Sequence, residues 1–151
     1  ILNPAVEVMM VIRTARIPAK LIGEIIMITN HAVQSTIPAK DLARARKFYE
    51  EKLGYKPDKV SPDGVFYKSN GCTSFFLYET PSAGTAQHTL LAWETTHLDA
   101  DMKDLRSRGV KFVEYDMPGL KTQDGVATTP DGTKAAWFKD SEGNILGIAQ
   151  M

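Results

Sequence analysis

The second half of this sequence repeats the order of helix and turn signals found in its first half. Gly54 and Gly109 each follow an amphipathic segment, at the position where helices commonly end in a glycine. A Pro-Asp-Gly turn signal comes after each of them, at residues 62–64 and 130–132. Chance rarely repeats a helix end, a turn and the strand patterns in the same order. The repeat therefore predicts two copies of one structural unit.

The first copy predicts a strand, a helix and then three strands. Residues 33–37 alternate between apolar and polar side chains, which indicates a half-buried strand that ends before Pro38. Asp41 is a candidate N-cap for a helix whose apolar side chains recur at helical spacing as far as Leu53. Short strand patterns follow at residues 59–61, 65–68 and 73–79.

The second copy has the same order with an additional segment. Residues 88–93 predict its first strand, and Thr96 with Asp99 has the spacing of a capping box at the start of a helix. Residues 117–124 contain most of the additional length. Further strands are predicted at residues 111–115, 126–128, 134–139 and 145–150.

Composition limits the classes of partner. The chain has 151 residues, 43% of them hydrophobic and 24% charged, which is typical of one globular domain. Its 18 basic residues balance 18 acidic ones. The sequence has no cluster of basic residues, so it gives no indication of binding to nucleic acid or to a membrane surface. The single cysteine, Cys72, cannot form an internal disulfide, so we expect a reducing, cytoplasmic location and an ordinary thiol.

Residues 1–30 lie outside the repeat. Their longest apolar run, residues 21–28, is interrupted by Gly23 and Glu24 and is shorter than the roughly 20 apolar residues of a membrane-spanning helix. A secretory signal is not evident either. We expect an N-terminal extension, either a segment translated upstream of a start at Met27 or an arm that packs on the domain or on a partner subunit.

Two segments carry a family resemblance. Residues 37–42 (Ile-Pro-Ala-Lys-Asp-Leu) precede Ala-Arg-Lys-Phe-Tyr-Glu at 45–50 and Leu-Gly at 53–54, and residues 138–146 are Phe-Lys-Asp-Ser-Glu-Gly-Asn-Ile-Leu. Apart from Ser141 in place of a proline, these segments resemble signatures of the vicinal oxygen chelate superfamily. That superfamily includes glyoxalase I, bleomycin-binding resistance proteins, fosfomycin-modifying thiol transferases and extradiol dioxygenases.

The resemblance covers residues 31–151 and implies an α+β fold. Two βαβββ modules, at residues 31–80 and 86–151, would form an open curled barrel around a cleft. Such chains often pair their modules in a homodimer, which we therefore expect here.

The resemblance also bears on metal binding. In metal-dependent relatives the first and last strands of each module each supply a ligand, and these positions correspond to Gln34, Phe76, His88 and Gly147. Phe and Gly side chains cannot bind a metal, so we expect no complete metal site and no other cofactor. If zinc, nickel, manganese or iron is bound, Gln34 and His88 are the expected ligands, and a shifted strand register would bring in Glu79 or Glu94.

Without a metal, the predicted cleft is mostly apolar with a few polar side chains, as is usual for small-molecule sites. We expect an apolar or aromatic ligand rather than a highly charged one. The alternative is that the same side chains fill the barrel and leave no cavity. The predicted ligand-binding residues are Gln34, Thr36, Phe76, Tyr78, His88, Leu90, Ile145 and Gly147.

Three functions remain open. The first is binding of a small, mainly apolar or aromatic molecule, as in drug-sequestering resistance proteins. The second is a glyoxalase-type lyase or isomerase, or a dioxygenase, that uses Gln34, His88 and further carboxylates. The third is a non-catalytic assembly or regulatory module that contacts its partner through residues 1–30. The incomplete ligand set favours the first, and no catalytic residue is assigned.

Overall fold

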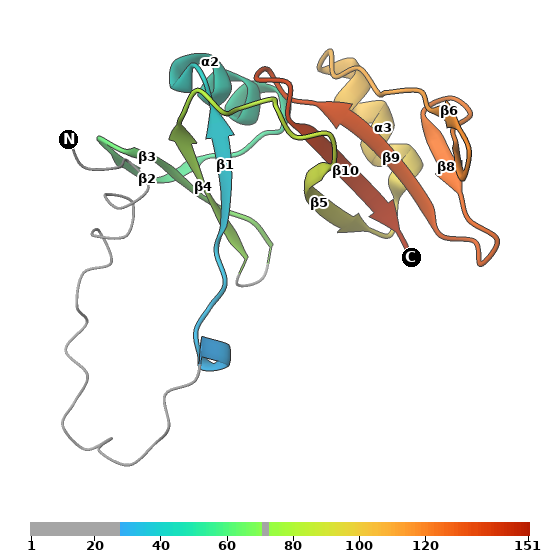
Figure 1. Ribbon diagram of the computed structural model, residues 1–151, viewed down its shortest axis with the longest axis horizontal. Coiled ribbons are helices and arrows are strands. Elements are labelled where there is room, and N and C mark those ends of the chain that lie inside the picture. Colours follow the sequence, from blue (N-terminus) through green and yellow to red (C-terminus); the bar gives the residue numbers. More distant parts are fainter. Residues whose placement is uncertain (1–27, 71–72) are drawn as a thin grey trace. The chain divides into compact units, whose positions relative to one another are not determined.

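The two copies of the predicted unit form two four-stranded sheets of the same topology (Figure 1). The computed structural model describes residues 28–70 and 73–151, and the unit that begins at Gln34 is considered by itself. In each sheet the first and last strands of the module are parallel neighbours, and the other neighbours are antiparallel. The predicted α+β fold of two βαβββ modules is confirmed. Among the described residues the sheets do not close into one barrel.

The strand order is β1-β4-β3-β2 in the first sheet and β5-β10-β9-β8 in the second. The first module comprises β1 (Ser35–Ala39), α2 (Leu42–Lys47), the π-helical turn η4 (Phe48–Lys52), β2 (Pro57–Ser61), β3 (Gly64–Lys68) and β4 (Ser74–Glu79). The second comprises β5 (Thr89–Thr95), α3 (Leu98–Ser107), β6 (Asp116–Met117), β7 (Leu120–Lys121), β8 (Val126–Thr128), β9 (Lys134–Lys139) and β10 (Ile145–Gln150). A short 3-10 turn, η3 (Ile28–Asn30), comes before them in the sequence. The β6–β7 hairpin occupies the additional segment of the second copy.

Each helix covers one face of a sheet. Ala45 and Tyr49 in the first module, and Leu98 and Met102 on α3, are at most 2% exposed. They join alternate strand side chains in one hydrophobic cluster that includes residues of both modules. Each sheet is left with a second face, which we call its helix-free face. Neither α2 nor α3, nor any other helix in the described ranges, combines the length and apolar character needed to cross a membrane.

The loop between β9 and β10 joins the two modules, and we call Asp140, Glu142 and Asn144 the clasp. Glu142 Oε2 accepts hydrogen bonds from the backbone N–H groups of Lys40 (2.8 Å) and Asp41 (3.0 Å), just before α2. Its side chain is fully buried and also pairs with the Arg44 guanidinium at 2.8 Å. Residues 138–146, the second segment with the family resemblance, therefore connect the two modules.

Asn144 adds further contacts to the clasp. Its Nδ2 donates to the Pro38 carbonyl (2.8 Å) and to Asp140 Oδ2 (2.8 Å), and its Oδ1 accepts from the Gly84 N–H (2.9 Å). Tyr49 donates its buried hydroxyl to Asp140 Oδ2 at 3.0 Å. The clasp thus contacts β1, the first-module helix and the segment between the modules.

The clasp carboxylates have opposite pKa shifts. Burial acts to raise the pKa of Glu142, but hydrogen bonds from Arg44, Ser141 and the backbone before α2 outweigh it and lower the pKa to about 2. Burial raises the pKa of Asp140 above its usual range, although its hydrogen bonds oppose that shift. Burial, together with the Asp140 carboxylate, also raises the pKa of Tyr49. Glu142 is consequently ionised at neutral pH.

The structure corrects the predicted end of the first strand. β1 continues through Pro38, which lies opposite Tyr78 of β4. β1 is an edge strand, and an edge strand tolerates a residue without a backbone N–H. The Pro38 carbonyl accepts a hydrogen bond from the Asn144 side chain.

Two predictions in the second module are also wrong. Residues 111–115 form no strand, and only Phe112 makes an isolated bridge, to Phe138. The predicted capping box of Thr96 and Asp99 does not form, since His97 is the N-cap of α3. The first free N–H of α3, that of Leu98, donates to Gln150 Oε1 (2.9 Å) at the end of β10. A side chain distant in the sequence thus takes the place of the local cap.

Candidate functional site

Aromatic rings cover the helix-free face of the first sheet. Thr36 lies opposite Phe76, and Pro38 lies opposite Tyr78, so these side chains share one face. The Phe66 and Phe76 ring centroids are 4.4 Å apart, and the Phe76 and Tyr78 rings are stacked at 6.1 Å. The face therefore presents a continuous row of three rings.

Gly64 accounts for how the Phe76 ring lies. A Cβ atom at Gly64 would come within 2.8 Å of Phe76 Cζ, so the ring packs directly over this glycine. Phe76 is only 6% exposed, whereas Phe66 and Tyr78 are half-buried and form the accessible part of the row.

The helix-free face of the second sheet is formed around Gly147. Gly147 lies between Ala92 of β5 and Trp137 of β9. A Cβ atom there would be 3.4 Å from both Thr89 Cγ2 and Trp137 Nε1. Trp137 donates its indole N–H to Thr89 Oγ1 (3.0 Å), and its ring meets that of Tyr115 edge-on at 5.6 Å. The position therefore has aromatic surroundings.

A β-bulge changes the predicted alternation along β5. Ile145 lies opposite Thr89, but Leu146 lies opposite Leu91, so the register shifts at Leu90. Leu90 packs against the hydrophobic core cluster, while Thr89, Ala92 and Glu94 follow the helix-free face. Ile145 is 8% exposed.

The four positions suggested by the family resemblance do not form a metal-ligating set. Gln34 and His88 each lie just before the first strand of a module, and both are exposed. Phe76 and Gly147 offer no ligand atom from their side chains. In the described ranges no group of three or more His, Cys, Asp and Glu side chains is placed to hold a metal ion. The residues present therefore do not fit such a centre.

The two carboxylates considered as substitutes lie on different sides of their sheets. Glu79 is opposite Ala39, a residue of the helix-covered face. Glu94 is opposite Ala149, on the same face as Gly147, and is exposed. Cys72, for which an ordinary thiol was predicted, lies outside the described residues.

The structure brings the predicted binding residues together in two groups. Thr36, Phe76 and Tyr78 share the helix-free face of the first sheet, and Ile145 and Gly147 lie in β10 of the second. Gln34 and His88 flank these strands, and Leu90 lies at the bulge. None of the eight lines either of the two cavities described next. Their role in ligand binding stays a prediction.

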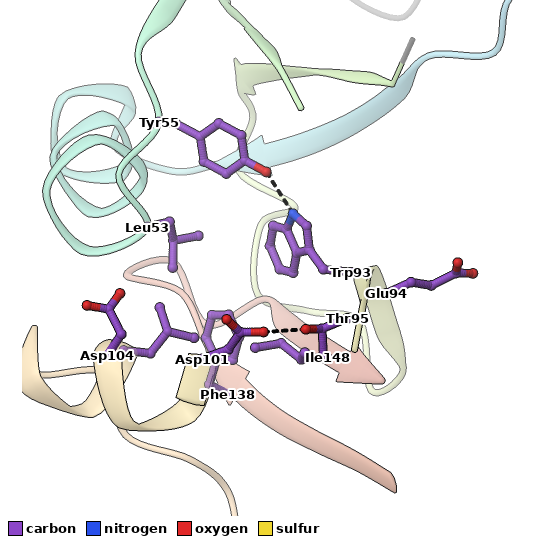
Figure 2. Close-up of a pocket in the computed structure, with 10 residues that line it drawn as sticks. Leu53, Tyr55, Trp93, Glu94, Thr95, Asp101, Asp104, Phe138 and Ile148 are labelled. Carbon is purple, nitrogen blue, oxygen red and sulfur yellow. Dashed lines mark hydrogen bonds between the residues drawn. The ribbon is translucent and has the colours of Figure 1, made fainter. Parts of the chain in front are cut away.

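One cavity lies on the helix-covered side, between the end of η4, β5, α3 and β10 (Figure 2). Its volume is about 310 Å³. The Trp93 indole N–H donates to the Tyr55 hydroxyl (2.7 Å) at one side of it, and Thr95 donates to Asp101 Oδ2 at another. The lining residues are Leu53, Tyr55, Trp93, Glu94, Thr95, Asp101, Asp104, Leu105, Phe138 and Ile148.

Sequence reasoning did not identify this cavity. Trp93 stacks on Phe138 with a centroid distance of 6.1 Å. The cavity exists because Leu53 and Tyr55, just after the first-module helix, approach α3 of the second module. No local periodicity in the sequence indicates that approach.

A second cavity of about 510 Å³ lies beside β1, β4 and β5. Hydroxyl and amide side chains line much of it, among them Ser35, Asn70 and Thr73. Phe75, Leu91 and Trp93 also belong to its lining, so polar and apolar side chains both contribute to this cavity.

The chain was compared with known proteins. A family model described as Glyoxalase/Bleomycin resistance protein/Dioxygenase superfamily matches residues 28–147. A comparison with curated protein sequences found no match.

Several solved structures share the fold. TnmS3, an antibiotic binding protein from Streptomyces sp. CB03234, is 27% identical, with a TM-score of 0.60, over 82% of this chain and 98% of its own. A glyoxalase/bleomycin resistance protein/dioxygenase from Alicyclobacillus acidocaldarius is 20% identical, with a TM-score of 0.62, over 80% and 91% of the two chains. A lactoylglutathione lyase from Agrobacterium tumefaciens is 15% identical, with a TM-score of 0.61, over 80% and 92%.

Proposed function

The chain belongs to the Glyoxalase/Bleomycin resistance protein/Dioxygenase superfamily, and on that premise we propose that it binds a small, mainly apolar or aromatic molecule without a complete metal site. The ligand contacts the helix-free faces of the sheets, where Thr36, Phe76, Tyr78, Ile145 and Gly147 lie. Gln34, His88 and Leu90 flank this surface.

The observation that carries the proposal is the Trp137 ring beside Gly147. This is the position on the last strand where the family resemblance leads us to expect a ligand of the metal. In this protein the Trp137 indole ring, held by its hydrogen bond to Thr89, lies beside that position. Aromatic rings of this kind bind apolar and planar molecules through large contact areas.

Two further observations support the same function. The first sheet adds the row of Phe66, Phe76 and Tyr78, so both helix-free faces are aromatic. The antibiotic binding protein TnmS3 shares 27% identity and the fold over almost its whole length.

A titration with a neutral planar molecule, acridone, tests the proposal. We expect acridone to shift the indole N–H resonance of Trp137 and to leave that of Trp93, on the opposite side of the sheet, unchanged. Trp137→Ala and Tyr78→Ala should each weaken binding about tenfold or more, the usual effect of removing an aromatic anchor. Val60→Ala is the matched control, since Val60 is exposed on β2 at a helix-covered register position.

Two outcomes would overturn the proposal. One is the absence of any Trp137 shift with acridone and with related neutral aromatic molecules. The other is a stoichiometric metal in elemental analysis, or a melting temperature raised by zinc, nickel, manganese or iron(II) through binding to the folded state. A metal would favour the alternative of a lyase, isomerase or dioxygenase, with Glu94 as the carboxylate nearest in register to Gly147.

We propose in addition that two copies of the chain form a homodimer in which the helix-free face of one supplies a wall for the other. The strands β1 and β5 are sheet edges, and open edges and apolar faces favour pairing. Sedimentation equilibrium measures the mass directly, and a monomer at all concentrations would contradict this part of the proposal. The cytoplasmic location stays a prediction from the single cysteine.

A further inference from the structure

The cavity of Figure 2 has an apolar floor and aromatic walls. Phe138 and Ile148 are 1% and 5% exposed, and Leu53 and Leu105 add to the apolar surface. The Trp93 ring lies parallel to that of Phe138, and Tyr55 fixes its indole N–H. A volume of about 310 Å³ accommodates a molecule the size of one substituted aromatic ring.

The charge of the cavity is negative. Its lining includes the carboxylates of Asp101 and Asp104 but no Lys, Arg or His. Glu94 also belongs to the lining, but Figure 2 shows its side chain directed away from the others. Asp104 pairs with Arg108 at 3.0 Å, so of these two aspartates Asp101 is the one without a cation partner among the described residues.

Asp101 is held in a fixed orientation. The Thr95 hydroxyl donates to its Oδ2 and at the same time accepts the His97 N–H (3.0 Å). No residue in the described part of the chain donates a hydrogen bond to Asp101 Oδ1, which can therefore accept a further donor at the edge of an apolar surface. A fixed carboxylate beside aromatic rings is the arrangement that recognises an ammonium group on an apolar body.

We propose that this cavity is a second binding site, for a monocationic amine with an aromatic or apolar body. The ammonium group donates to Asp101 Oδ1, and the body lies against Trp93, Phe138 and Ile148. The site is on the opposite side of the second sheet from Gly147 and is independent of the function proposed above.

The test compares 2-phenylethylammonium with its neutral isostere 2-phenylethanol on the full chain. The chain has 2 tryptophans, so the two indole N–H resonances separate the sites. We expect the amine to shift the Trp93 resonance and to leave that of Trp137 unchanged. 2-Phenylethanol should bind at least about tenfold more weakly, because it lacks a charge-assisted hydrogen bond.

Matched variants test the role of Asp101. Asp101→Asn should weaken binding of 2-phenylethylammonium about tenfold, while Asp99→Asn, in the same helical turn but outside the lining, should leave the affinity unchanged. Equal binding of the amine and the alcohol, or no Trp93 shift up to the solubility limit, would overturn the proposal. Because both comparisons use the unaltered chain, they decide the question even if Asp101→Asn fails to fold.

Discussion

Gly64 and Gly147, on the two helix-free faces, differ in how much space is available for a side chain. A Cβ atom at Gly64, whose φ is +155°, would lie 2.1 Å from the Leu77 carbonyl oxygen, whereas one at Gly147 would meet Thr89 and Trp137 at 3.4 Å. Gly64→Ala should therefore cost about 3 kcal/mol of unfolding free energy, and Gly147→Ala less than about 1 kcal/mol. Urea denaturation measures both. Equal stability of the two variants would contradict the geometry of β3.

Glu142 makes the stability of the protein depend on pH. Its folded-state pKa of about 2 lies below the ordinary value of 4.5, so its contribution is present above pH 4.5 and is lost as the pH falls towards 2. At neutral pH, Glu142→Gln should lower the unfolding free energy on the order of 3 kcal/mol. The difference from the unaltered protein should vanish in acid.

Denaturation at several pH values measures this difference. Asp140 has a raised pKa and the opposite pH dependence, but it is present in both proteins and largely cancels in the comparison. Glu51→Gln, at an exposed position, is the control and should show little difference at any pH. A Glu142→Gln deficit that persists unchanged at pH 2 would contradict the assigned role of the charge.

Among the helices and strands, the sequence patterns correctly predicted the features that depend on neighbouring residues, such as helix caps and helix ends. Asp41 does cap α2 by accepting the Arg44 N–H (2.9 Å), and Gly54 and Gly109 adopt the positive φ expected after a helix. The predictions were wrong where a residue distant in the sequence makes the hydrogen bond. Gln150 replaces the local cap of α3, and Asn144 binds the carbonyl of Pro38.

For the candidate site, too, the sequence predicted the features that depend on local alternation and missed those that depend on distant contacts. Strict alternation placed Thr36, Phe76 and Tyr78 on one face because β1 and β4 are regular. It could not anticipate the bulge that moves Leu90 towards the core, since a bulge depends on the pairing partner. The cavity beside Trp93 requires contacts between modules, which no periodicity encodes.

The β6–β7 hairpin is an addition to the duplicated unit, and we expect it to be dispensable for folding. At its base the Thr122 N–H donates to the Tyr115 carbonyl and the Tyr115 N–H donates to the Thr122 hydroxyl, while Asp116 and Met117 are exposed. Replacing residues 116–121 by Asn-Gly should change the unfolding free energy by less than about 1 kcal/mol, because surface loops tolerate changes of length. Thermal denaturation measures the effect, and loss of a cooperative transition would show that the hairpin is part of the core.

At the scale of the whole molecule, the clasp and the shared hydrophobic cluster should make the two modules unfold together. Both tryptophans belong to the second module, so the fluorescence of Trp137 follows that module and the fluorescence of Trp93 follows it together with the contact to Tyr55. Far-UV circular dichroism follows both modules. We expect the two signals to give the same urea midpoint, the usual criterion for a two-state transition.

Asn144→Ala extends this test, because it removes the bonds to Pro38, Gly84 and Asp140 at once. The buried partners left unsatisfied should each cost about 1–3 kcal/mol, so the midpoint should fall. Both signals should still move together, since the hydrophobic cluster continues to connect the modules. A fluorescence midpoint that separates from the dichroism midpoint in the variant would instead make the clasp the main connection between the modules. Separation in the unaltered protein would mean that the duplicated units fold independently, as two domains.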